Sequence, residues 1–127
     1  MIVVDASAAI LGLLNDGDAR RRLATEAFAV PHLADVEIAH VLRGHVLKGM
    51  LTAEDGQTAL VRWSKLGMQR FGAVGILERV WELRANVSAY DATYVALAEE
   101  LDCALVTADA RLAGAPGPRC SIIVVRR

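Results

Sequence analysis

Cysteine and aromatic residues are both scarce in this sequence, which limits the sites that it can build. Only two of the 127 residues are cysteines, and aromatic residues account for 5%. Cys103 and Cys120 do not form a CxxC pair, and no nearby histidine completes a zinc pattern. We therefore expect two buried thiols in a reducing compartment, without a disulfide framework. Most aromatic residues, Tyr90 and Tyr94 included, fit the core, so no stacking platform for nucleic-acid bases is predicted.

Long apolar runs and a strong net charge are absent as well. No apolar run approaches the ~18 residues that a membrane-spanning helix needs. The acidic Asp5 interrupts the first run, which is unlike a secretory leader. We therefore expect a cytoplasmic protein with no membrane partner. The formal net charge of −1 gives no overall sign of nucleic-acid binding, so any contact with a polyanion must come from local basic patches.

Hydrophobic residues, in contrast, make up 54% of the chain. This content and the small net charge exclude intrinsic disorder. The length predicts a single domain over residues 1–127 that folds without a disulfide or metal staple. Two kinds of structure could account for this apolar excess. One is a parallel sheet buried on both faces, and the other is a surface that binds a partner.

Short apolar runs alternate with helical segments along the chain. Strands are predicted at residues 2–4, 28–30, 103–107 and 121–125, with a weak edge strand within 67–74. Helices are predicted over residues 6–14, 18–27, 33–48, 52–66, 76–84 and 88–101. Asp18 and Thr52 are the expected caps of two of these helices. Strands that alternate with helices predict a parallel sheet between two helical layers, which is an α/β/α architecture.

Two aspartates follow predicted strands. Asp5 comes directly after the first strand, and Asp109 follows the strand that ends at Thr107. Open α/β sheets bind ligands at the carboxyl ends of their strands, so both positions are candidates for a site. Each also has an ordinary structural explanation, because Asp5 can cap the following helix and Asp109 can serve a turn.

Two further acids lie on predicted helices. Glu37 falls on the inward stripe of its helix with Leu33, where a carboxylate is costly unless it is paired or bound to a cation. Asp35, on the other side of that helix, is expected in solvent. Asp91 matches a capping box that begins at Ser88, which would explain this aspartate without a site.

Taken together, these four carboxylates would reach one edge of the sheet. Two such charges about 4 Å apart repel by ~4 kcal/mol at an effective dielectric constant of 20, so a cluster stays ionised only around a cation. Oxygen ligands without thiolate or imidazole favour Mg²⁺, for which Mn²⁺ can substitute. We interpret His40 and His45 as surface or packing residues rather than ligands. The site would suit hydrolysis of phosphodiester bonds.

Four short motifs lie in order along the chain, at residues 2–7 (IVVDAS), 31–37 (PHLADVE), 86–99 (NVSAYDATYVALAE) and 105–112 (LVTADARL). Together they resemble the PIN-domain ribonucleases, and most closely the VapC toxins of type II toxin–antitoxin systems. The resemblance covers essentially the whole chain. Each motif is weak alone, and their order and spacing make the match specific.

The resemblance implies a three-layer α/β/α PIN-like domain whose five-stranded parallel sheet has the order 3-2-1-4-5. It implies Mg²⁺-dependent endoribonuclease activity that inhibits translation and growth. Metal binding is carried over to Asp5, Asp91 and Asp109, and Glu37 completes the catalytic quartet. The positions that support this quartet in relatives correspond to Ser7, Thr107 and Asn86.

Partners are implied by the same resemblance. The substrate would be tRNA, rRNA or mRNA, and the protein would form a homodimer that a VapB-type antitoxin silences. Operator DNA would be bound only through the antitoxin. Candidate phosphate contacts are the basic residues Arg20, Arg21, Arg22, Arg43, Lys48, Arg62, Lys65, Arg70, Arg126 and Arg127.

Two other functions remain open at this point. The protein could be an antitoxin-binding module that represses a shared promoter with little catalysis, which the apolar excess favours. It could also be a structure-specific DNA nuclease, since related folds carry similar metal sites. Haloacid-dehalogenase or phosphatase chemistry is disfavoured, because Ser7 stands where a second aspartate is expected.

Overall fold

The centre of the molecule is a five-stranded sheet, which the computed structural model describes with all residues 1–127. Its strands are β1 (Ile2–Val4), β2 (Phe28–Pro31), β3 (Gln69–Phe71), β4 (Ala104–Thr107) and β5 (Ile122–Val124). They lie in the order β3-β2-β1-β4-β5, and every neighbouring pair is parallel. The expected order is confirmed. Because all strands point the same way, their carboxyl ends meet at one edge of the sheet.

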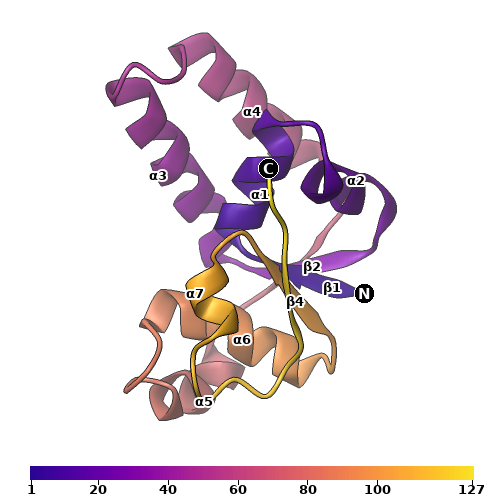
Figure 1. The fold of residues 1–127 in the computed structure, drawn as a ribbon, viewed down its shortest axis with the longest axis vertical. Helices are drawn as coiled ribbons and strands as arrows, with labels where there is room; N and C mark the ends of the chain where they lie inside the picture. Colours follow the sequence, from indigo (N-terminus) through magenta and orange to yellow (C-terminus); the bar gives the residue numbers. More distant parts are fainter.

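Helices cover both faces of this sheet, as Figure 1 shows. One layer contains α1 (Ala6–Leu14), α2 (Asp18–Thr25), α3 (Leu33–Leu47) and α4 (Ala53–Lys65). The other contains the 3₁₀ turn η1 (Val74–Ile76) and helices α5 (Leu77–Glu82), α6 (Ala89–Glu100) and α7 (Ala110–Ala113). The three-layer α/β/α architecture is therefore confirmed. The sequence did not predict α7, which is only one turn long.

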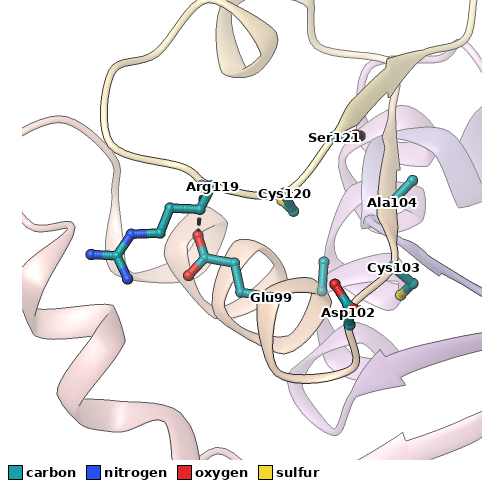
Figure 2. Close-up of a pocket in the computed structure, with 8 residues that line it drawn as sticks. Glu99, Asp102, Cys103, Ala104, Arg119, Cys120 and Ser121 are labelled. Atoms are coloured by element: carbon teal, nitrogen blue, oxygen red, sulfur yellow. Dashed lines mark hydrogen bonds between the residues drawn. The ribbon is translucent and has the colours of Figure 1, made fainter.

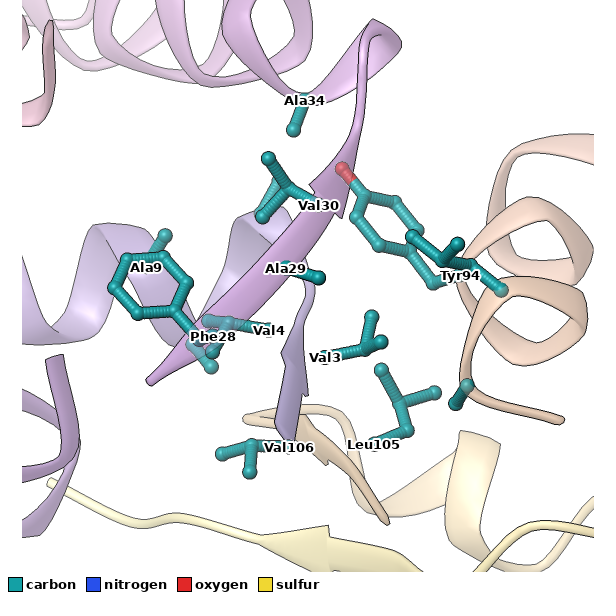
Figure 3. Packing of buried hydrophobic residues seen from close by; sticks show 14 of the residues in the cluster. Val3, Val4, Ala9, Phe28, Ala29, Val30, Ala34, Tyr94, Leu105 and Val106 are labelled. Atoms are coloured by element: carbon teal, nitrogen blue, oxygen red, sulfur yellow. The ribbon is translucent and has the colours of Figure 1, made fainter. Parts of the chain in front are cut away.

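Alternate strand residues pack against opposite helical layers. Figure 3 shows Val4 and Val106 on the side of Ala9 in α1, and Val3 and Leu105 on the side of α6. The four strand residues are at most 2% exposed. A strand that is buried on both faces must be apolar at every position, which explains the continuous apolar runs of β1 and β4.

Several helices begin as the sequence predicts, and one does not. Thr52 caps α4 by accepting a hydrogen bond from the Asp55 N–H, and Ser88 caps α6 by accepting one from the Asp91 N–H. Asp18 does not cap α2; Gly17 stands at that position, with φ 139°, and Asp18 is the first helical residue. Its carboxylate instead pairs with arginines one turn later in the same helix, a favourable place for a negative charge.

The sequence places Leu33 and Glu37 on the inward face of α3, but the fully buried face begins one residue later. Ala34, Ile38 and Leu42 are the buried residues, and Glu37 lies half-buried beside them. Asp35 is only partly in solvent, with its side chain 42% exposed. Its carboxylate accepts hydrogen bonds from Trp63 Nε1 at 2.7 Å and from the Arg70 guanidinium at 2.9 and 3.0 Å, which joins α3 to α4 and β3.

Both cysteines are free thiols, as expected, although they are half-buried rather than fully buried. They line a cavity of about 480 Å³ at the amino-terminal edge of β4 and β5. In Figure 2 the Arg119 backbone N–H donates to Glu99 at the mouth of this cavity. None of the helices is long and apolar enough to cross a membrane.

Candidate active site

The predicted acids surround the point where the strand order reverses. From β1 the chain adds β2 and β3 on one side of the sheet and then β4 and β5 on the other side. Asp5 lies at the carboxyl end of β1, and Asp109 lies two residues after β4. The Asp5 N–H donates to the Val106 carbonyl at 3.1 Å, which places the two strand ends side by side. This reversal is where open α/β sheets bind ligands.

Asp5 is both a helix cap and a buried carboxylate. Its Oδ1 accepts from the Ala8 N–H at 3.0 Å and from the Ser7 hydroxyl at 2.7 Å. The residue is 4% exposed, and burial raises the pKa of its carboxyl group, while the hydroxyls of Thr107 and Ser7 lower it. All of these partners are neutral. The predicted cap is therefore confirmed, and the same buried carboxylate also lies at the carboxyl end of β1, where the sequence predicts a site.

Ser7 and Thr107 link Asp5 to the loop that carries Asp109. The Ser7 hydroxyl lies 3.2 Å from the Thr107 hydroxyl and accepts from the Ala108 N–H at 2.9 Å. Thr107 Oγ1 in turn accepts from the Asp109 N–H at 3.0 Å. The structure thus brings the two expected supporting hydroxyls together between the ends of β1 and β4.

Glu37 reaches the site from α3 and is held by a tyrosine of α6. The hydroxyl of Tyr94 donates to Glu37 Oε1 at 2.5 Å. Tyr94 is 1% exposed, and burial together with this bond raises the pKa of its phenol far above the usual value. Burial raises the pKa of Glu37, the Tyr94 bond lowers it, and the charges of Asp91 and Asp5 raise it again.

Asp91 enters from the first turn of α6. Its backbone N–H donates to Ser88 Oγ at 3.1 Å, so the expected capping interaction forms. The carboxylate is half-buried, and its pKa is raised by burial and by the charges of Asp5 and Asp109. The cap satisfies the backbone of this residue and leaves its side chain for the site.

Asp109 differs from the other three acids. It caps α7 by accepting from the Arg111 N–H at 3.0 Å, and its carboxylate also pairs with the Arg111 side chain, whose Nε lies 3.2 Å away. These bonds lower the pKa of Asp109. The Arg111 side chain is 92% exposed, so this ion pair lies at the surface and is weak.

One cavity of about 380 Å³ gathers most of these groups. Asp5, Ser7, Glu37, Asp91 and Tyr94 line it. His45 of α3, interpreted from sequence as a surface or packing residue, lines it as well. The sequence could have indicated this position, because His45 lies about two turns after Glu37 and therefore on the same face of the helix. Asp109 does not line this cavity, and Asn86 is exposed, with its backbone N–H bonded to the Leu83 carbonyl.

The electrostatics of this cavity favour a cation. Asp5, Glu37 and Asp91 form no ion pair with a lysine or arginine of the chain. The charges of Asp5 and Asp91 raise the pKa of Glu37, and the charge of Asp5 raises that of Asp91. In this structure no three acid, histidine or cysteine side chains lie close enough to bind one metal ion together. The donor set is nonetheless rich in carboxylate oxygen, which fits a hard divalent cation.

Comparison with protein families identifies the family of this chain. The PIN domain family matches residues 2–117. The chain belongs to the PIN-domain family, whose nucleases generally depend on divalent metal ions. Its fold is similar to that of PAE2754 from Pyrobaculum aerophilum, with a TM-score of 0.72, 24% identity, and coverage of 97% of this chain and 83% of the other.

Proteins similar in sequence and in structure define the type of PIN-domain protein more closely. Ribonuclease VapC9 of Mycobacterium tuberculosis is 57% identical over 127 residues, which cover 100% of both chains. The VapBC2 structure from Rickettsia felis, bound to a DNA fragment from its promoter, has a similar fold, with a TM-score of 0.69, 12% identity, and coverage of 96% and 97%. This protein is accordingly an endoribonuclease of the VapC type.

Proposed function

We propose that this protein is the Mg²⁺-dependent toxin of a VapBC-type pair and cleaves RNA at the cavity formed by Asp5, Glu37 and Asp91. One observation carries the proposal. Three carboxylates that form no ion pair with a basic residue line one cavity at the switch point of the sheet. Burial raises the pKa of all three, and the charges of neighbouring acids, Asp109 included, raise them further. Such a cluster is stabilised by a divalent cation.

Asp5 and Asp91 are the residues that would hold Mg²⁺ or Mn²⁺, with Asp109 as a further ligand. A bound divalent cation supplies charge neutralisation at the phosphodiester and activation of water. The hydroxyls of Ser7 and Thr107 fix the Asp5 carboxylate in its orientation. Glu37 is held by Tyr94. Its carboxylate would orient the attacking water by accepting a hydrogen bond from it.

Asp109 can join this set only when its carboxylate leaves Arg111. The Arg111 side chain lies almost entirely in solvent, so this ion pair is screened and weak. A divalent cation competes easily with such an interaction. Once released, the Arg111 guanidinium is available to an RNA phosphate at the rim of the site.

The basic residues divide into those already paired and those that can contact RNA. Arg20, Arg21, Arg22 and Arg70 form ion pairs with aspartates of this chain. Of the basic residues proposed from the sequence, those left as candidates for phosphate contact are Arg43, Lys48, Arg62, Lys65, Arg126 and Arg127, and a released Arg111 would join them. Substrates are expected among tRNA, rRNA or mRNA, where unpaired nucleotides can enter the cavity.

An antitoxin of the VapB type is the expected protein partner, in the cytoplasm. A chain of the VapBC2 structure has a similar fold, and α3 and α4 of this chain form an apolar groove of about 280 Å³. Leu42, Val46 and Leu60 are among the residues that line it. An amphipathic helix of the antitoxin would bury this groove, and operator DNA would be bound through the antitoxin alone. A homodimer is expected as well.

The decisive experiment is cleavage of total cellular RNA by antitoxin-free protein, with Mg²⁺ or with EDTA, beside Asp5→Asn. We expect new 5′ ends at a few sites with Mg²⁺, none with EDTA, and a loss of at least about 10²-fold in Asp5→Asn. Asparagine can still cap α1, so the variant should fold.

Two outcomes would contradict this proposal. If folded wild-type protein cuts no RNA with Mg²⁺ or Mn²⁺ but binds its antitoxin, the protein is a binding and repression module. If it cuts flapped or single-stranded DNA in preference to RNA, it is a DNA nuclease.

A further inference from the structure

A second cavity lies beside the acid cavity, and the two share Glu37. It has a volume of about 640 Å³ and is lined by Leu33, Val36, Glu37, His40 and Tyr90. Glu37 is the only acid on its walls, and no lysine or arginine lines it. One wall comes from α3, and the other is the Tyr90 ring at the start of α6.

Tyr90 departs from the sequence prediction of a core residue. It is 67% exposed, whereas Tyr94, one turn later, is 1% exposed. Val36, on the opposite wall, is 74% exposed. Because both line one cavity next to the candidate active site, they form an exposed apolar surface on which a ligand can lie.

The position of Tyr90 limits what that ligand can be. Tyr90 lines the second cavity together with Glu37, which also lines the acid cavity, so a ligand on the ring lies close to a carboxylate. The acids repel an extra phosphate or an acidic peptide that would lie against the ring. A neutral, flat and partly polar group suits the cavity, because it can stack on the ring while its edge bonds to His40.

We infer that this second cavity binds one unpaired base of the RNA substrate, next to the cleaved phosphodiester, by stacking on Tyr90. This inference rests on the proposed function. A strand whose phosphate occupies the acid cavity must place a neighbouring nucleotide close by, and the shared Glu37 wall makes the second cavity continuous with that path. Sequence-specific recognition of RNA commonly uses unstacked bases on aromatic side chains.

The test begins by mapping the cut sites of the wild-type protein in total RNA, and then uses a short single-stranded RNA that spans one mapped site. Tyr90→Ala should lower kcat/KM on this RNA by about 5- to 100-fold, the range for loss of one base stack. Tyr90→Phe keeps the ring and should stay within about twofold of wild type. Trp81→Ala is the matched control, because Trp81 is 68% exposed but lines neither cavity.

A modified RNA identifies the stacked base directly. Replacing one nucleotide beside the cut with an abasic ribose should slow wild-type cleavage to the rate of Tyr90→Ala on the intact RNA. On the abasic RNA, Tyr90→Ala and wild type should then cut equally fast. This non-additivity would not arise if Tyr90 acted only by supporting the fold.

Failure of the inference can be told apart from failure of the proposed function. If wild type cuts no RNA, both fall. If wild type cuts RNA but Tyr90→Ala cuts the same sites at the same rate, only the base-binding inference falls. If Tyr90→Ala slows cleavage equally on intact and abasic RNA and converts a dimer to a monomer in light scattering, the patch is an interface between copies of the chain and the inference is overturned.

Discussion

At the level of single residues, backbone capping and site chemistry coincide. The Asp5 carboxylate caps α1 and faces the acid cavity, and Asp109 caps α7 beside it. The Asp91 backbone is capped by Ser88 while its side chain faces the acids. A cap orients the residue by hydrogen bonds to fixed backbone groups. The Asp5 and Asp109 carboxylates and the Asp91 backbone are therefore held in place before any cation or substrate binds.

Tyr94→Phe tests whether Glu37 needs its tyrosine partner. The substitution removes the 2.5 Å hydrogen bond and leaves the buried ring in place. Because a hydrogen bond to a charged group contributes about 1.5–3 kcal/mol, we expect a loss of about tenfold in kcat with little change in KM. Cleavage kinetics on a short RNA measure both constants.

The double variant Tyr94→Phe with Glu37→Gln serves as the control for this bond. If Tyr94 acts through Glu37, adding Tyr94→Phe to Glu37→Gln should cost much less than tenfold. An unchanged tenfold cost in the Glu37→Gln background would show that Tyr94 acts by another route.

At the level of elements, α6 positions one acid through its first turn. Ser88→Ala removes the hydroxyl that accepts from the Asp91 N–H, and it should cost about 1 kcal/mol in the free energy of unfolding. Because Asp91 lies in that turn, cleavage should also fall by several-fold. Urea unfolding and RNA cleavage on the same preparation measure the two effects.

Thr52→Ala is the matched control for that prediction. Thr52 caps α4 by the same contact, at 3.0 Å to the Asp55 N–H, and α4 contributes no residue to the acid cavity. It should lose a similar free energy of unfolding and keep its cleavage rate. Equal losses of cleavage in both variants would mean that general stability, rather than the placement of Asp91, limits activity.

At the level of the whole molecule, the acid cavity lowers stability in the absence of a cation. Burial raises the pKa values of Asp5, Glu37 and Asp91 in the folded state, and repulsion from neighbouring acids, Asp109 included, raises them further. Between their ordinary values near 4 and these raised values, the folded state binds more protons than the unfolded state. Their contribution to stability therefore falls as pH rises through that window and stays low above it.

Thermal unfolding of wild type beside Asp91→Asn checks this sign. In EDTA, wild type should lose stability relative to Asp91→Asn as the pH is raised from about 4 to neutrality. Adding Mg²⁺ at ten times its Kd should restore about 1.4 kcal/mol to wild type and much less to the variant. A wild type that is the more stable of the two at neutral pH in EDTA would contradict the repulsion argument.

Much of the fold was predictable because its determinants are local. The apolar runs of β1 and β4 reflect burial on both faces, and the caps of α4 and α6 depend on residues three positions apart. The four acids could be proposed as one site because parallel strands end at the same edge. Asp18 shows the limit of this reasoning, since the preceding Gly17 adopts the positive φ and takes the cap position.

The sequence by itself determined the α/β/α architecture, the strand order through family resemblance, and the candidate acids. Only the tertiary structure decided that Asp35 is bonded to Trp63 and Arg70, that Asp109 pairs with Arg111, and that Tyr90 is exposed. The physical reason is that helical periodicity states which residues share a face but not which neighbour covers that face. Which neighbour covers it, and where a cavity remains, depends on contacts between segments that are far apart in the chain.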